Sequence, residues 1–257
     1  MNASAADRPD GFLGGRVHLY QGQGGHKAGF DAAFLQAAIP AKARGHLVDF
    51  GAGCGAVALA AAARAPALSV TGIECEPAMV ALAKRALADP GNTEFAGRVR
   101  FVEGDVTAGR PACEALGLAE RSADWLVMNP PFETAGTVRA TPDRLKAAAH
   151  VMEAGGLNAW ARSAASLLKA RGRMAMIHRA DALADIVAAL AGRFGALTLL
   201  PLHPRAGEPA SRLVVTAICG GKGPVSLLPG MALHEKDGAW TPAADDILNG
   251  RTALPVW

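Results

Sequence analysis

The chain has 257 residues, enough for one large α/β domain with a substantial core but too few for two full-sized domains to be the expectation. Hydrophobic residues make up 51% of it, much of that alanine, and no run reaches the roughly 18 apolar residues that a membrane span requires. The formal net charge of +3 is spread along the chain, so it permits nucleic-acid binding without requiring it.

The first residues and the cysteines indicate where the protein works and which chemistry it lacks. Residues 7–10 read Asp-Arg-Pro-Asp where a secretory signal would have its apolar core, which predicts a cytoplasmic protein. The cysteines are scattered, with no Cys-x-x-Cys pair and no histidine at a zinc-like spacing: Cys54, Cys75, Cys113 and Cys219. We therefore expect reduced thiols and no metal site.

A glycine-rich turn joins the first buried strand to a helix. The apolar run 46–50 ends in Gly51-Ala-Gly53-Cys-Gly55, and an alanine-rich stretch follows to residue 65. This order is typical of a strand, a tight loop and a helix, and such a loop lets a ligand approach bare backbone near a helix N-terminus.

The pattern continues as βα units, which predicts a Rossmann-like, mostly parallel sheet with helices on both faces. The expected strands after the first are 68–73, 98–102, 123–128, 172–178, 196–202 and 213–218. Only a short loop separates the last two strands. A parallel connection needs about a dozen residues, so we expect the last strand to be antiparallel.

The chain divides into three expected parts. Residues 1–40 form an amino-terminal segment beside the site, residues 41–220 form the main domain, and residues 221–257 form an appended extension. In that extension, Asp237-Gly238 predicts a hairpin turn, and a short helix is expected from about Pro242 to Leu248.

Three carboxylates follow or end strands that should meet at one edge of the sheet. Glu74 ends the second strand and is placed to accept hydrogen bonds from ribose hydroxyls. Asp105 follows the third strand and could accept from an adenine amino group, although an ordinary turn aspartate is an equal interpretation. Asp49 precedes the glycine loop in a buried strand, where it needs a cationic ligand group or loop amides as partners.

The glycine loop alone leaves two cofactors open. Gly51-x-Gly53-x-x-Ala56 also satisfies the G-x-G-x-x-G/A dinucleotide fingerprint, with Glu74 near the position of its ribose-binding acid. An NAD-dependent oxidoreductase is therefore an alternative from this region.

The segment Asn129-Pro130-Pro131-Phe132 separates these interpretations. Prolines remove backbone donors, so the loop after strand 123–128 offers two acceptors, the Asn129 side-chain oxygen and the Pro130 carbonyl. Two converging acceptors suit an –NH2 group, and Phe132 offers a flat face on which a base can stack. We predict Asn129, Pro130 and Phe132 as the catalytic residues.

With these motifs the chain resembles the class I S-adenosylmethionine-dependent methyltransferases, in the amino-methylating branch with Asn-Pro-Pro-Phe/Tyr, and in particular the small bacterial methyltransferases related to the tRNA (adenine-N6)-methyltransferase. The resemblance covers about residues 14–220, including Gly29–Leu35. It implies a seven-stranded sheet with an antiparallel seventh strand. It also implies S-adenosylmethionine as the cofactor, held by Asp31, Asp49, Gly51, Gly53, Gly55, Glu74, Asp105, Val106 and Asn129.

The expected reaction is methyl transfer to an exocyclic amine, with adenine N6 in tRNA or another structured RNA as the leading acceptor and no membrane or metal partner. A protein glutamine amide also fits between two acceptors. An O-methyltransferase or small-molecule methyltransferase is a weaker alternative because a hydroxyl acceptor usually requires a base or metal. The NAD-dependent oxidoreductase lacks an evident Tyr-x-x-x-Lys pair, since the only tyrosine is Tyr20. A non-catalytic binding module would not need two acceptors directed at an amine.

Overall fold

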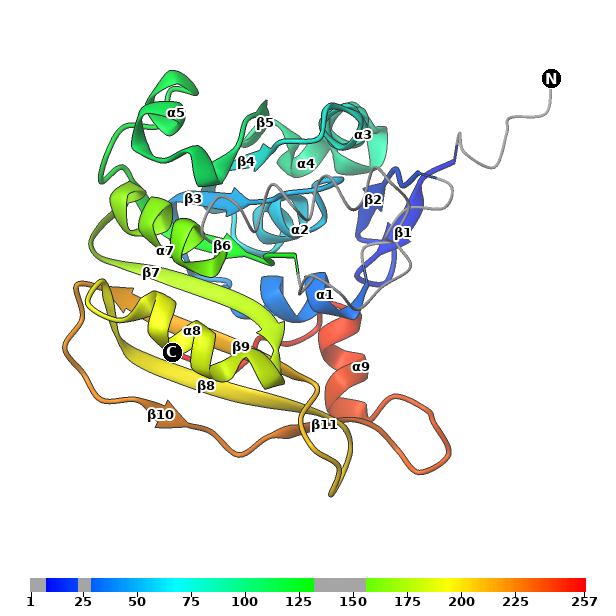
Figure 1. Cartoon of the computed structure of the whole chain (residues 1–257). Helices are drawn as coiled ribbons and strands as arrows, with labels where there is room; N and C mark the ends of the chain where they lie inside the picture. Colours follow the sequence, from blue (N-terminus) through cyan, green and yellow to red (C-terminus); the bar gives the residue numbers. More distant parts are fainter. Residues whose placement is uncertain (1–7, 23–28, 132–155) are drawn as a thin grey trace, which may run out of the picture.

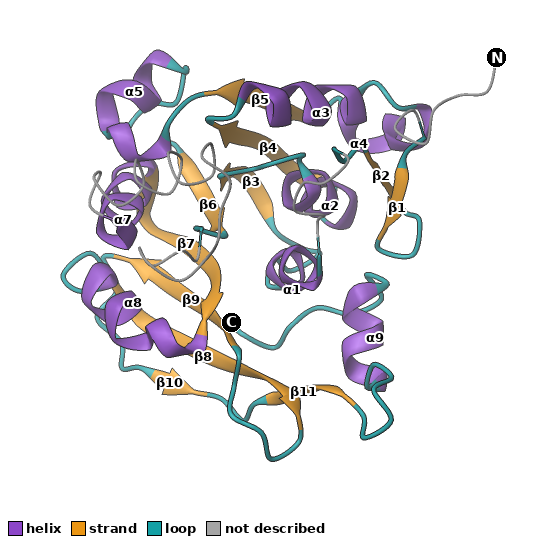
Figure 2. Cartoon of the chain, turned by 45° about the vertical axis from the view of Figure 1, so that its right-hand side comes forward, coloured by secondary structure: helices purple, strands orange, loops and turns teal. Residues whose placement is uncertain are grey.

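A computed structural model describes residues 8–22, 29–131 and 156–257. Its core is a twisted sheet between two layers of helices (Figures 1 and 2). The sheet strands, in chain order, are β3 Arg44–Phe50, β4 Ala67–Glu74, β5 Val99–Glu103, β6 Ala123–Met128, β7 Leu168–Arg179, β8 Phe194–Arg205, β9 Arg212–Cys219, β10 Ser226–Leu227 and β11 Met231–His234. Among the described residues, the helices of four or more residues are α1 Phe30–Ala37, α2 Ala56–Arg64, α3 Pro77–Leu87, α4 Thr93–Ala96, α5 Arg110–Ala115, α7 Gly156–Leu167, α8 Leu183–Leu190 and α9 Pro242–Leu248.

The strand order confirms the expected sheet. The seven main strands run β8-β9-β7-β6-β3-β4-β5, and every pairing from β7 to β5 is parallel. Strand β9 is antiparallel to both β7 and β8, as the short loop before it required. In chain order, β4 and β5 are therefore added on one side of β3, and β6 is then added on its other side. A ligand crevice is expected at such a change of direction.

The extension 221–257 adds to the sheet in a way that the sequence did not indicate. Strands β10 and β11 both pair with β8 in parallel, so they widen the sheet at its edge. The Asp237-Gly238 turn is present, closed by a bridge between His234 and Trp240, and α9 has the predicted bounds. The extension is therefore partly sheet rather than only a hairpin and a helix.

Two hydrophobic clusters hold the helices to the two faces of the sheet. One lies between the sheet and α1, α2 and α3, with α9 also contributing, and the other lies between the sheet and α5, α7 and α8. Alanine dominates α2 because this helix is buried almost all round, and its small side chains let it lie close to β3 and β4. No helix among the described residues is long and apolar enough to cross a bilayer.

A small amino-terminal hairpin, β1 Asp10–Phe12 with β2 Val17–Leu19, contacts the domain through Asn92 and through a buried carboxylate. Asp89, just after α3, accepts hydrogen bonds from the Tyr20 hydroxyl (2.7 Å) and the Gly91 amide (2.8 Å), and its other contact is the His18 ring nitrogen at 2.7 Å. Burial tends to raise the pKa of Asp89, but these hydrogen bonds outweigh it and the pKa is lower than usual.

We expect Asp89→Ala to destabilise the protein by about 2–3 kcal/mol, because it leaves the buried Tyr20 hydroxyl without its charged partner. A folded-state pKa below the unfolded value means that this stability is present above the unfolded pKa and is lost as the pH falls through the folded pKa. Denaturant unfolding at neutral and acidic pH measures both effects. Asp246→Ala, which removes an exposed partner of Arg251, is the control and should cost under about 1 kcal/mol.

Candidate functional site

The glycine loop turns between β3 and α2 with three residues in the left-handed region. The φ angles of Gly51, Gly53 and Gly55 are 66°, 55° and 89°. A Cβ on Gly51 would lie 2.8 Å from Cη2 of Trp160, and one on Gly55 would lie 2.5 Å from Cζ of Phe101. At Gly53 a Cβ would meet no atom within 4 Å. The outer two glycines are therefore needed for packing, whereas Gly53 presents its backbone to open space.

Glu74, at the end of β4, holds this loop in place. Its Oε2 accepts a hydrogen bond from the Gly53 amide at 2.8 Å, and its Oε1 accepts one from the Glu76 amide at 2.9 Å. The Ala52 amide also donates to the Ile73 carbonyl at 2.9 Å. The Cys75 thiol also donates to Oε1 at 3.5 Å, whereas Oε2 keeps a second lone pair, so Glu74 can still accept from a ligand hydroxyl.

Asp49 is 2% exposed and points from β3 toward the start of α2. Its carboxylate accepts a hydrogen bond from the Ala58 amide, while Oδ2 is buried and has no partner. Burial raises the pKa of Asp49 to about 8; the Ala58 hydrogen bond opposes this shift and the charge of Glu74 adds to it. A buried acceptor with a free oxygen is costly unless a ligand uses it.

Asn129 lies beside the glycine loop because β6 pairs with β3. The register places Met128 opposite Phe50, so the residues that follow, Asn129 and Gly51, are neighbours across the strand ends. The Asn129 Oδ1 atom is buried without a hydrogen-bond partner. Pro130 is buried and Pro131 is exposed, and Phe132 lies outside the described residues.

Asp105 and Val106 lie at the same edge, after β5. The Asp105 Oδ1 atom accepts hydrogen bonds from the amide and the hydroxyl of Thr107 at 2.7 and 2.6 Å. These are the hydrogen bonds of an ordinary turn aspartate, which was one of the two interpretations that the sequence allowed. Its carboxylate remains exposed, and Val106 is buried beside it.

Asp31, in the first turn of α1, forms an ion pair that the sequence did not indicate. Its Oδ1 is 3.1 Å from Nε of Arg212, at the start of β9, and the Arg212 guanidinium lies over the Phe30 ring at 5.6 Å. Since Arg212 pairs in register with Arg179 at the end of β7, Asp31 is at the carboxyl edge of the sheet with the other site residues.

Trp160 of α7 is the other neighbour of the loop that sequence reasoning missed. Its ring packs edge-on against Phe50, with centroids 6.2 Å apart, and it fills the space beside Gly51. No motif marks it, because the contact joins residues more than 100 positions apart. Cys54, within the loop, is buried, and burial raises the pKa of its thiol to about 11, so the loop offers no thiolate nucleophile.

The structure therefore brings the sequence-predicted residues that it describes, all except Phe132, to the carboxyl ends of β3, β4, β5 and β6, with Asp31 contributed by α1. Among the described residues no cluster of three or more His, Cys, Asp or Glu side chains is placed to hold a metal ion. The chemical groups gathered here are open backbone at Gly53, carboxylates, and a buried amide oxygen.

The raised pKa of Asp49 predicts a stability change with a defined sign. Between the ordinary carboxyl pKa and about pH 8 the folded state holds one more proton than the unfolded state, so stability falls as the pH rises. Asp49→Asn cannot ionise and should gain about 4 kcal/mol over the native protein between about pH 5 and pH 8.5, because about three pH units separate pH 5 from the pKa near 8, at about 1.4 kcal/mol per unit.

Denaturant unfolding at both pH values measures this difference. Asp124→Asn is the matched control, because hydrogen bonds from Lys169 and the His46 amide outweigh burial and keep the pKa of Asp124 low, so its loss should destabilise the protein at the higher pH. A flat difference between Asp49→Asn and the native protein across this range would show that Asp49 is already ionised in the free protein.

The protein-family model "Methyltransferase small domain" matches residues 26–200 of this chain. A tRNA1(Val) (adenine(37)-N6)-methyltransferase of Porphyromonas gingivalis is 33% identical over 141 residues, which is 55% of this chain and 52% of that protein. The match thus spans about half the length of the curated relatives.

Solved structures agree with the fold. A crystal structure described as a predicted O-methyltransferase from Agrobacterium tumefaciens is 32% identical, covers 87% of this chain and 98% of its own, and has a TM-score of 0.75. An S-adenosylmethionine-dependent O-methyltransferase from Thermotoga maritima shares the fold alone, at 17% identity and a TM-score of 0.50 over 75% of this chain and 66% of that one. The oxidoreductase alternative is not supported by any of these matches. The chain belongs to the methyltransferase small domain family, within the class I S-adenosylmethionine-dependent methyltransferases.

Proposed function

We propose that the protein transfers the methyl group of S-adenosylmethionine to an exocyclic amine, and that the amine is adenine N6 in tRNA or another structured RNA. The observation that carries the proposal is the buried Asn129 Oδ1, which has no partner and lies beside the glycine loop. A buried acceptor without a donor costs about 1–3 kcal/mol, and a substrate N–H group would supply that donor.

The residues at the carboxyl edge fit the cofactor. The open space at Gly53 allows close approach to the backbone, and the unpartnered Oδ2 of Asp49 suits the cationic end of a methionine portion. Glu74 retains a lone pair for a ribose hydroxyl, and Asp105 with Val106 follows the neighbouring strand, where the adenine would lie. We assign Gly51 and Gly55 to shaping the loop, and Asp31 to the methionine end through its ion pair with Arg212.

The protein's own part in the reaction is to orient the amine. S-adenosylmethionine, when bound, supplies an electrophilic methyl group on a sulfonium sulfur. The adenine amine is a weak nucleophile because its lone pair is delocalised into the ring, so hydrogen bonds to Asn129 Oδ1 and the Pro130 carbonyl would hold it in line with that methyl group. The same oxygens stabilise the positive charge that develops on nitrogen, and the methylated amine then loses one hydrogen to water as a proton.

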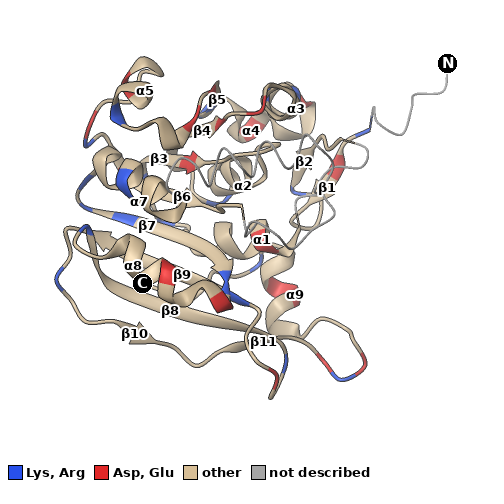
Figure 3. Cartoon of the chain, in the orientation of Figure 1, with Lys and Arg blue, Asp and Glu red and all other residues tan. Residues whose placement is uncertain are grey.

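An RNA acceptor must bring its base into this crevice. A base stacked in a helix cannot reach Asn129 at the strand ends, so the target would be unstacked or flipped, and Phe132 is the proposed stacking partner. Figure 3 shows Lys and Arg positions interspersed with Asp and Glu positions along the described ribbon, so we expect positioning in the crevice rather than one strongly basic segment to determine recognition. The sequence similarity to a tRNA adenine-N6 methyltransferase supports this acceptor, and the cytoplasm is the compartment it implies.

The experiment that tests the function is label transfer. Purified protein is incubated with methyl-labelled S-adenosylmethionine and, separately, with tRNA and protein fractions from a strain that lacks this gene, followed by nucleoside and peptide analysis. Label in N6-methyladenosine is expected. Label in a glutamine side chain, or in a hydroxyl group as the name of the Agrobacterium relative suggests for that protein, would replace the acceptor and leave the cofactor assignment intact.

Asn129→Ala should lower kcat by a factor of about 10² or more while leaving the affinity for S-adenosylhomocysteine within a few-fold, because the lost contact is made to the acceptor. Single-turnover rates and calorimetric titration measure the two quantities. Pro131→Ala alters an exposed neighbour in the same loop and serves as the control. Near-normal turnover of Asn129→Ala would disprove the acceptor role.

Two glycine variants separate packing from ligand approach. Gly51→Ala and Gly53→Ala both place a side chain at positive φ, at a similar cost of about 1 kcal/mol. Gly51→Ala also collides with Trp160, so it should lose about 1–3 kcal/mol more stability than Gly53→Ala. Gly53→Ala should instead weaken S-adenosylhomocysteine binding at least tenfold. Equal affinities for Gly53→Ala and the native protein would place the cofactor elsewhere.

A further inference from the structure

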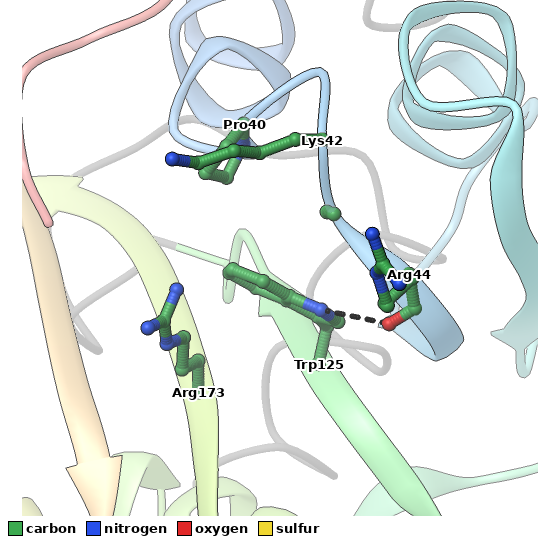
Figure 4. A pocket seen from close by; sticks show the side chains of 6 residues that line it. Pro40, Lys42, Arg44, Trp125 and Arg173 are labelled. Atoms are coloured by element: carbon green, nitrogen blue, oxygen red, sulfur yellow. Dashed lines mark hydrogen bonds between the residues drawn. The ribbon is translucent and has the colours of Figure 1, made fainter.

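A pocket lies at the opposite edge of the sheet from the glycine loop. It has a volume of about 290 Å³ and is lined by Pro40, Lys42, Ala43, Arg44, Trp125 and Arg173 (Figure 4). Arg44 begins β3, whose other end leads into the glycine loop. Six steps of about 3.3 Å separate the two ends of this strand, so the pocket is about 20 Å from the proposed methylation site.

The pocket is strongly cationic. Three of its six lining residues are Lys42, Arg44 and Arg173, and none is acidic. Across the described ranges, no carboxylate forms an ion pair with any of these three side chains, although the nearby Lys169 is paired with Asp124 at 2.7 Å. Three uncompensated cations around one pocket repel each other, and a bound anion would relieve that repulsion.

The Arg173 guanidinium is oriented by two indoles. It lies 5.0 Å from the centre of the Trp125 ring and 5.2 Å from that of Trp257, and these rings pack edge-on with centroids 5.4 Å apart. The Trp257 indole donates to the Ala38 carbonyl at 2.5 Å, which fixes the second ring. Cation–π contacts hold an arginine by the face of its guanidinium and leave its N–H groups available to a planar or tetrahedral anion.

The remaining walls are apolar and rigid. Trp125 is 7% exposed, and its indole N–H donates to the Arg44 carbonyl at 3.3 Å. Figure 4 shows Pro40 and Lys42 across the pocket from the Trp125 ring, with Arg173 and Arg44 on either side of it. A volume near the lower end of small-molecule sites exceeds what a phosphate ion alone would fill, so the walls have room for a flat ring beside the anion.

We propose that this pocket binds a small phosphate ester with a flat ring, of the mononucleotide class. The phosphate lies among Lys42, Arg44 and Arg173, and the ring lies against Trp125 and Pro40. Its position at the amino edge distinguishes it from the crevice at the carboxyl edge, so it does not depend on the proposed methyl acceptor. The volume of about 290 Å³ has room for one flat ring beside one phosphate, which favours a small ligand over a continuous RNA strand.

The test uses calorimetric titration of the full chain with adenosine 5′-monophosphate, at saturating S-adenosylhomocysteine so that the cofactor site cannot take up the nucleotide. We expect saturable binding that Lys42→Gln and Arg44→Gln each weaken about tenfold. Both side chains are exposed, so neither change should unfold the protein. Arg171→Gln removes an exposed cation from the same strand as Arg173 but outside the pocket, and should have no effect.

Inorganic phosphate, adenosine and tRNA are titrated as comparison probes. Phosphate and adenosine should each bind at least tenfold more weakly than the nucleotide, because each makes only part of the contacts. The proposal would be overturned if the nucleotide did not bind, or if it bound no more tightly than phosphate. It would also be overturned if Lys42→Gln and Arg44→Gln bound the nucleotide as tightly as the native protein does. If the native protein bound tRNA but not the nucleotide, and the two variants lost tRNA binding, the pocket would be an RNA contact and the proposal would be wrong. Affinity for S-adenosylhomocysteine, measured in the same variants, should stay unchanged whichever outcome holds.

Discussion

The site depends on the parallel pairing of β3 with β4 on one side and with β6 on the other. This register brings the glycine loop, Glu74 and Asn129 to one edge although they are up to 78 residues apart in the chain. The Gly53 amide to Glu74 hydrogen bond then fixes the loop against β4, so the open backbone has a defined position before any ligand binds. Preorganisation of this kind spares the ligand the cost of ordering the loop.

Two buried oxygens at this edge support the proposed ligand site. Asp49 Oδ2 and Asn129 Oδ1 are both buried without partners, at the ends of adjacent strands. Protein interiors seldom leave such groups unsatisfied, and exceptions are concentrated at functional sites. Nearby packing is tight by contrast, since Trp160 and Phe101 close the space beside Gly51 and Gly55. The molecule thus combines tightly packed glycines with two buried oxygens that have no protein partner.

Features that depend on local pattern were predictable from the sequence. Strand 123–128 and helix 242–248 have the predicted bounds, and the short loop before residue 213 correctly required an antiparallel strand. Features that depend on contacts between distant residues were not, because no local periodicity encodes them. These include the pairing of β10 and β11 with β8, the Asp31 to Arg212 ion pair, and the Arg173–Trp125–Trp257 group at the amino edge. For Asp105 the local sequence predicted the turn hydrogen bonds but did not decide on a ligand role, because both use the same carboxylate.

The most direct measurement for the central claim is a crystal structure of the protein with S-adenosylhomocysteine. The account predicts that the ligand lies over Gly53, with its ribose at Glu74 and its sulfur facing Asn129, so that Asn129 Oδ1 is within reach of an acceptor amine. A complex in which the ligand binds away from Gly53, or in which its sulfur lies away from Asn129, would contradict it.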